Sequence, residues 1–203
     1  MKLISRFVTT FSLVFLMACS GASETDTENT SSSWTLNPIS SGITYVTIKN
    51  GSLGEINTFR EISGTVSKSG KAEFIVNLNS VDTNNEIRDP RMREILFETD
   101  KFPSAKVSAN LDMSEFEDLS IGSSKTVLLD MTLDLHGISE QFDFYVLVTR
   151  LGPNKVKVDN KAPLLLDAED FGLGDGLAKL QELAGLESIS PVVSATVALT
   201  FER

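Results

Sequence analysis

Basic side chains gather in one short stretch of an otherwise acidic chain. The 203 residues carry a formal net charge of −10, yet Arg88, Arg91 and Arg93 fall within six residues and Lys101 follows. A planar guanidinium group matches the geometry of carboxylate and phosphate oxygens. Two interpretations stay open. The arginines pair with acidic neighbours on a solvated helix, or Arg88 and Arg91 face the mouth of a binding site and hold a phosphate or pyrophosphate head group.

Residues that commonly carry catalysis are scarce. His136 is the single histidine and Cys19 the single cysteine, so a zinc cluster or a cysteine–histidine pair has too few members. His136 stands beside Gly137 between two alternating segments, which is typical of a turn residue whose ring hydrogen-bonds locally. The sequence therefore predicts no enzyme, no metal site and no cofactor. Catalysis on a bound molecule through His136 is a minor alternative.

The first residues have the pattern of an export signal. Lys2 and Arg6 precede an apolar run of twelve residues, which is too short to cross a bilayer as a helix. The run ends at Ala18 and Cys19 in a pattern that resembles the lipobox of bacterial lipoproteins. We expect residues 1–18 to be a signal peptide and Cys19 to be acylated, which places the protein in the cell envelope.

A polar tether follows the cysteine. Residues 20–33 are small, polar or acidic and contain no large apolar side chain, so we expect a disordered linker from residue 19 to residue 33. Removal of residues 1–18 takes away two basic residues and no acid, which changes the net charge from −10 to −12. Such a surface repels nucleic acid and anionic lipid head groups, so membrane attachment depends on the acyl chains. By resemblance to lipoprotein sorting signals, the residue after Cys19 favours the outer membrane, and we expect the anchored protein on its periplasmic side.

Residues 34–203 form one predicted domain rich in strands. Apolar residues alternate with polar ones over long segments, which indicates antiparallel strands with one dry face. The length of these strands favours an all-β barrel closed around its own interior. The inward sets are Phe74, Val76 and Leu78; Val107, Ala109 and Leu111; Val127, Leu129, Met131, Leu133 and Leu135; Phe142, Phe144, Val146 and Val148; and Val193, Ala195, Val197, Leu199 and Phe201.

Two segments break the alternation. The spacing from Arg88 to Glu98 predicts a short helix with Asp89 as its N-cap and Pro90 in its first turn. A second, weaker helical pattern runs from Gly176 to Glu187. These helices are expected to cover the ends of the barrel.

Several motifs in this order resemble the YceI-like family. They are Ser80-Val81-Asp82-Thr83, Arg88-Asp89 with Arg91, Lys101-Phe102-Pro103, and Leu133-Asp134-Leu135-His136-Gly137. The opening Trp34-Thr35-Leu36 and the late Asp170-Phe171-Gly172 also fit, so the resemblance covers nearly all of residues 34–203. Where the family often has a histidine, this chain has Lys49-Asn50.

The resemblance implies a lipocalin-like antiparallel barrel whose apolar cavity binds a polyisoprenoid or isoprenoid-quinone-like lipid, carried or stored in the periplasm. The sequence is compatible with a homodimer. The alternative is a structural or stress-related interaction module with a filled barrel, which alternation alone does not distinguish from a hollow one. The predicted wall and head-group residues are Phe74, Val76, Met131, Leu133, Phe142, Phe144, Arg88 and Arg91.

Overall fold

The computed structural model describes residues 33–203. The predicted signal peptide and Cys19, together with the tether up to residue 32, lie outside the described residues. Within residues 33–203, no helix is both long and apolar enough to span a membrane.

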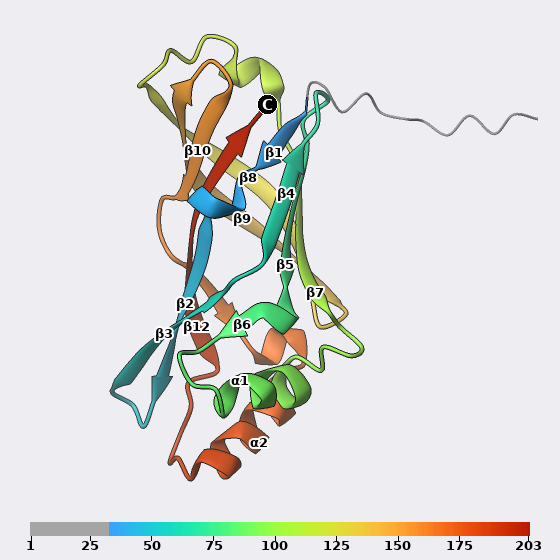
Figure 1. Ribbon diagram of the computed structural model, residues 1–203, viewed down its shortest axis with the longest axis vertical. Helices are drawn as coiled ribbons and strands as arrows, with labels where there is room; N and C mark the ends of the chain where they lie inside the picture. The colour runs from blue at the N-terminus through green and yellow to red at the C-terminus, as the bar shows by residue number, and fades with distance from the viewer. Residues whose placement is uncertain (1–32) are drawn as a thin grey trace, which may run out of the picture. The chain divides into compact units, whose positions relative to one another are not determined.

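Eight antiparallel strands close into a barrel (Figure 1). Each strand pairs with the next around the ring, and the ring closes where Thr35 and Leu36 of the first strand pair with Glu202 and Phe201 of the last. Closure leaves no open edge along the ring. In ring order the strands are β1 (Trp34–Leu36), β4 (Ile62–Val66), β5 (Lys71–Asn77), β7 (Ser104–Asn110), β8 (Ser124–Leu135), β9 (Ile138–Gly152), β10 (Lys155–Asn160) and β12 (Val192–Glu202).

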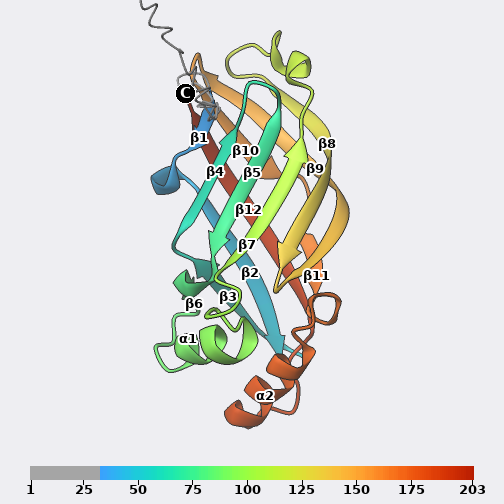
Figure 2. The same cartoon turned by 90° about the vertical axis from the view of Figure 1, so that its right-hand side faces the viewer.

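A second set of strands extends the sheet at the other half of β12. β12 pairs there with β2 (Gly42–Lys49), which forms a hairpin with β3 (Leu53–Phe59), and β3 pairs in turn with the short β6 (Val81–Asp82). On its opposite edge β12 pairs with β11 (Leu164–Asp167). The β2–β3 hairpin projects beyond the barrel wall beside the two helices (Figures 1 and 2).

The period-two pattern explains the barrel wall. Met131, Leu133 and Val146 are 5%, 5% and 4% exposed, whereas Asp130 and Asp134 on the alternate face of β8 are exposed. The prediction of antiparallel strands around an apolar interior is confirmed. The ends of two predicted sets lie just beyond their strands, because Leu78 begins a 3₁₀ turn and Leu111 follows the last residue of β7. The 3₁₀ turns are Pro38–Ser40, Leu78–Ser80, Met113–Phe116 and Glu169–Phe171.

The first predicted helix has a different start from the one expected. α1 (Arg88–Arg91) continues as a π-helical turn, η4 (Met92–Leu96), so the helical segment ends before Glu98. The predicted N-cap at Asp89 is wrong, because this residue lies inside the first turn and its Oδ1 accepts hydrogen bonds from Thr83 N (2.9 Å) and Thr83 Oγ1 (2.5 Å). Asn85 takes the capping role, since its Oδ1 accepts from Ile87 N (3.0 Å) and Arg88 N (3.2 Å).

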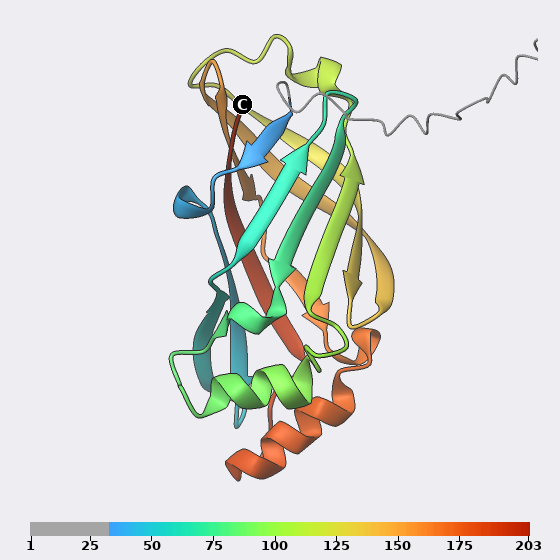
Figure 3. The ribbon, with the colours of Figure 1, turned by 45° about the vertical axis from the view of Figure 1, so that its right-hand side comes forward.

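The second helix packs against the first at the same end of the barrel (Figure 3). α2 (Gly174–Ala184) starts two residues earlier than predicted and ends at Gly185, which adopts a left-handed conformation with φ 62°. A Cβ atom at Gly176 would lie 2.6 Å from the carbonyl oxygen of Ile95. Glycine therefore permits the close approach of the two helices.

His136 sits at the β8–β9 turn, as predicted, but its hydrogen bonds are not local. Its Nδ1 lies 3.2 Å from Phe171 O and its Nε2 lies 3.2 Å from a carboxylate oxygen of Glu98. These partners are 35 and 38 residues away in the sequence. The ring therefore joins three separate segments at the helical end of the barrel.

Candidate functional site

The barrel encloses a cavity of about 440 Å³. This volume lies within the range of about 300–1,000 Å³ that is typical of small-molecule pockets. Apolar side chains from the barrel strands line most of it, and Met92 and Leu96 of η4 and Leu177 and Leu180 of α2 complete it at the helical end. The barrel is therefore not packed solid, which contradicts the filled-barrel alternative.

Most of the predicted wall residues surround this cavity. Phe74 and Val76 of β5, Met131 and Leu133 of β8, and Phe144 of β9 all line it. Their role in binding a ligand stays a prediction.

Phe142 is the one predicted wall residue that does not line the cavity. It lies on the same face of β9 as Phe144, but its ring packs 6.5 Å from the ring of Phe171, centroid to centroid. Phe171 is 1% exposed and thus belongs to the packed core, so Phe142 contributes to the same packing.

The β2–β3 hairpin presents polar side chains to the cavity, which sequence reasoning missed. Tyr45, Thr47 and Lys49 of β2 and Asn57 of β3 line the cavity, and Glu55 lies on the same hairpin face and contacts Lys49. The outer face of the hairpin is apolar instead, with Ile48 41% exposed and Ile56 66% exposed. The usual arrangement of an antiparallel sheet, apolar inward and polar outward, is thus reversed here.

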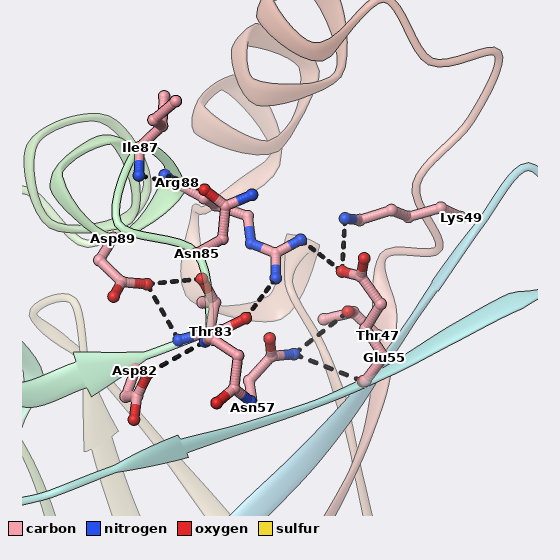
Figure 4. Close-up of polar contacts among 11 residues, drawn as sticks. Thr47, Lys49, Glu55, Asn57, Asp82, Thr83, Asn85, Ile87, Arg88 and Asp89 are labelled. Carbon is pink, nitrogen blue, oxygen red and sulfur yellow. Dashed lines mark hydrogen bonds and ion pairs between the residues drawn. The ribbon is translucent and has the colours of Figure 1, made fainter.

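Arg88 extends from α1 into this polar cluster (Figure 4). Its Nη1 forms an ion pair with Glu55 Oε2, and its Nη2 donates to the carbonyl oxygen of Thr83 at 2.6 Å. Lys49 Nζ reaches the same Glu55 oxygen at 2.5 Å. Arg88 therefore faces the cavity, but its acidic partner is Glu55 on β3 and not a neighbour on its own helix.

Arg91 lines the cavity farther along the helical end. Its Nη1 donates to the carbonyl oxygen of Leu183 on α2 at 3.5 Å, so it connects the two helices. Arg93 is not among the residues that line the cavity, and Lys101 pairs with Glu98 at 2.5 Å. The four basic residues thus separate into distinct environments.

Charge and burial shift the pKa of two groups in the polar cluster. Burial alone would raise the pKa of Glu55, but hydrogen bonds and charge interactions with Lys49 and Arg88 outweigh it and hold that pKa below its usual value. Burial raises the pKa of Tyr45 well above its usual value, while the charge of Arg88 lowers this pKa and the charge of Asp89 raises it by smaller amounts. Tyr45 is therefore a neutral phenol and Glu55 a carboxylate at neutral pH.

The signal that could have revealed this cluster was present but ambiguous. Tyr45, Thr47 and Lys49 are spaced by two, as are Glu55 and Asn57 across the Asn50-Gly51 turn. Both faces of such a hairpin contain side chains that could be buried, so spacing alone does not say which face turns inward. Lys49, which stands where the family often has histidine, lies in this cluster.

Among residues 33–203, no group of three or more His, Cys, Asp or Glu side chains is arranged to hold a metal ion. The fold and the cavity together define a closed antiparallel barrel with an apolar interior and a polar group of residues at one end. The family model for the YceI-like domain matches residues 34–202, and the chain belongs to this family. A comparison with curated protein sequences gave no match.

Solved structures share the fold. A polyisoprenoid binding domain from Saccharophagus degradans, described as implicated in plant cell wall breakdown, is 34% identical, with a TM-score of 0.82 over 83% of this chain and 97% of that chain. BcnA from Burkholderia cenocepacia is 13% identical, with a TM-score of 0.62 over 81% of this chain and 98% of that one. The YceI protein of Campylobacter jejuni is also 13% identical, with a TM-score of 0.52 over 72% and 84% of the two chains.

Proposed function

We propose that this protein binds a polyisoprenoid or isoprenoid-quinone-like lipid with its tail inside the barrel. The observation that carries the proposal is the apolar cavity of about 440 Å³, lined by side chains such as Phe74, Met131 and Phe144. A hydrocarbon tail has no polar group of its own that such surroundings would leave unpaired. The 34% identical barrel from Saccharophagus degradans, described as a polyisoprenoid binding domain, supports the same class of ligand.

The energetics favour a long tail. Each buried methylene-sized unit contributes about 0.8 kcal/mol, so a tail of several isoprene units gives tight binding without a strong head-group interaction.

The cavity also reaches the helical end of the barrel, where Asn85, Ile87 and Pro191 line it. Entry at this end would place the head group beside the polar face of the β2–β3 hairpin.

We further propose that the protein is anchored by acylated Cys19 and carries or stores its ligand on the periplasmic side of the outer membrane. The support is the lipobox-like sequence that ends at Cys19. Mass spectrometry of the full chain from its native membrane tests this part. A diacylated or triacylated Cys19 in the outer-membrane fraction is expected, and an unmodified Cys19 contradicts it.

The proposed activity is binding without turnover. His136 does not line the cavity, and both of its ring nitrogens are engaged, with Phe171 O and with Glu98. A ligand in the cavity would therefore not contact this side chain. A His136→Ala variant that retains the bound lipid unchanged in mass agrees with the proposal, whereas accumulation of a modified lipid in the wild type alone contradicts it.

Native mass spectrometry of the full chain, purified from its own membrane in mild detergent, tests the central proposal. The expected spectrum contains a complex heavier than the protein by the mass of one isoprenoid lipid. The extract of the same sample should contain that lipid in about equimolar amount. Protein that repeatedly carries no lipid, and that takes up none from added isoprenoids, would refute lipid binding.

A further inference from the structure

Three buried polar atoms within residues 33–203 lack a hydrogen-bond partner, and all three belong to residues that line the cavity. They are the hydroxyl of Tyr45, Oδ1 of Asn57 and Nε of Arg88. Tyr45 is 7% exposed and Asn57 is 2% exposed. Unpaired buried polar groups are costly, so three of them around one cavity call for an explanation, and a ligand that pairs with them supplies one.

The remaining atoms of these side chains are held in place. Nδ2 of Asn57 donates to Thr47 Oγ1 at 3.2 Å and to the carbonyl oxygen of Glu55 at 3.5 Å, which leaves Oδ1 free to accept. Both terminal nitrogens of Arg88 are engaged, by Glu55 and by Thr83. The ring of Tyr45 stacks on Phe59 with the centroids 5.5 Å apart. The three unpaired atoms are therefore preorganised (Figure 4 shows Asn57 and Arg88).

The hydrogen-bonding capacity of these atoms specifies a complementary head group. Nε of Arg88 can only donate, Oδ1 of Asn57 can only accept, and the phenol of Tyr45 can do either. A ligand that satisfies all three must itself both donate and accept. A hydroxyl group does so with a single oxygen atom, whereas a quinone carbonyl offers only acceptors.

The charges around the cluster disfavour an anionic head. Lys49 and Arg88 are cationic, but both contact the same carboxylate oxygen of Glu55. A diphosphate would have to displace that carboxylate from both cations, in a chain with a net charge of −10. The geometry therefore does not favour the prediction that Arg88 holds a phosphate or pyrophosphate head group.

We infer that Tyr45, Asn57 and Arg88 form a head-group site that selects an uncharged isoprenoid alcohol over an isoprenoid quinone or diphosphate. This inference rests on the proposed function, because the tail must occupy the barrel. It specifies which member of the lipid class the site is built for.

Four probes that share a twenty-carbon isoprenoid skeleton separate the contribution of the head group to binding from that of the tail. They are geranylgeraniol, geranylgeranyl diphosphate, menaquinone-4 and the headless hydrocarbon phytane. Dissociation constants of the full chain in detergent are measured by competition calorimetry. The alcohol should bind at least about tenfold more tightly than each of the other three, since each alternative leaves one or more buried polar atoms unpaired.

Two tyrosine variants provide a matched pair. Tyr45→Phe removes the unpaired hydroxyl and should weaken binding of the alcohol about five- to tenfold, with no effect on phytane. Tyr145 is 55% exposed on β9 and does not line the cavity, so Tyr145→Phe should leave all four constants unchanged. In the absence of ligand, Tyr45→Phe should melt at the wild-type temperature or above it, because no hydrogen bond is lost.

The outcomes separate this inference from the proposed function. Equal affinities for the alcohol, the quinone and the diphosphate overturn the head-group site and leave lipid binding intact. Tighter binding of the diphosphate also overturns it and assigns the head to the cations. Failure of all four probes to bind overturns both proposals. A clear loss of thermal stability in ligand-free Tyr45→Phe shows that the hydroxyl is already paired, which also overturns the head-group site.

Discussion

The barrel wall and the β2–β3 hairpin use the same period-two spacing with opposite orientations. Along β8, Met131 and Leu133 face inward and Asp130 faces solvent. Along the hairpin, Asn57 and Lys49 face inward and Ile56 is exposed. The barrel wall thus presents an apolar surface suited to a hydrocarbon. The hairpin places hydrogen-bonding groups at one end of that surface. One continuous sheet thereby carries both the apolar and the polar surface that the proposed amphiphilic ligand requires.

The two regions also differ in how they are stabilised. The wall depends on burial of apolar area, which is non-directional and tolerates changes of shape. The hairpin depends on a polar network in which Glu55 bridges Lys49 and Arg88, and such a network is weakened by loss of any member.

The largest effect is expected from filling the cavity at Ala109. This residue is 9% exposed, lies on β7 opposite Met131 and lines the cavity. Ala109→Phe should exclude three or more methylene-sized units of the tail, at about 0.8 kcal/mol each, and so weaken binding of phytane about a hundredfold. Calorimetry measures the loss.

Ala178→Phe is the matched control for Ala109→Phe. Ala178 lies on the exposed side of α2 and does not line the cavity, so this variant should bind phytane as the wild type does. Retention of wild-type affinity by Ala109→Phe would show that the tail does not occupy this part of the barrel.

Glu55→Gln tests the polar network. The variant leaves Arg88 and Lys49 without their carboxylate partner, and we expect a loss of about 2 kcal/mol in the free energy of unfolding at pH 7. Chemical denaturation with urea measures this difference. A variant as stable as the wild type would show that the network contributes nothing to folding.

The same pair of proteins gives a pH-dependent prediction. Because the pKa of Glu55 is lower in the folded protein, its contribution is fully present above the pKa of an unfolded glutamate and is lost as the pH falls through the folded value. The difference in free energy of unfolding between the wild type and Glu55→Gln should therefore be constant from about pH 6 to 8 and become smaller as the pH falls below that range. A difference that grows in acid contradicts the assigned direction of the shift.

Gly176→Ala disturbs the helices that border both regions. The added Cβ would meet the carbonyl oxygen of Ile95 at 2.6 Å, so α2 must move away from η4. We expect a net loss of about 1 kcal/mol, since the cost of overpacking exceeds the better helix propensity of alanine. In Gly174→Ala the atoms nearest to the new Cβ belong to the movable carboxylate of Glu169, so this control should be neutral or stabilising.

The smallest effect is expected on the outer face of the hairpin. Ile56 is 66% exposed, and Ile56→Thr should change the free energy of unfolding by less than about 0.5 kcal/mol. Thermal denaturation measures it. A loss above 1 kcal/mol would mean that this face is covered in solution, and the reversed orientation of the hairpin would need another explanation.

The barrel could be predicted from the sequence because alternation over long segments leaves one orientation for each wall strand. The same rule failed for the hairpin, since Tyr45, Thr47 and Lys49 on one face and Ile48 on the other give no clear inward side. The acidic partner of Arg88 is 33 residues away and the partners of His136 are 35 and 38 residues away, so no local pattern specifies them. Asp89 misled the helix prediction because its carboxylate serves Thr83, a contact made by the preceding turn.

A crystal structure of the full chain with geranylgeraniol would show whether the barrel wall holds the tail and the β2–β3 hairpin holds the head group. We expect the hydroxyl oxygen to lie within hydrogen-bonding distance, about 2.7–3.2 Å, of the Tyr45 hydroxyl and Asn57 Oδ1, with the tail passing along the wall formed by Ala109 and Met131. A ligand with its hydroxyl at the opposite end of the barrel, or bound outside the cavity altogether, would contradict it.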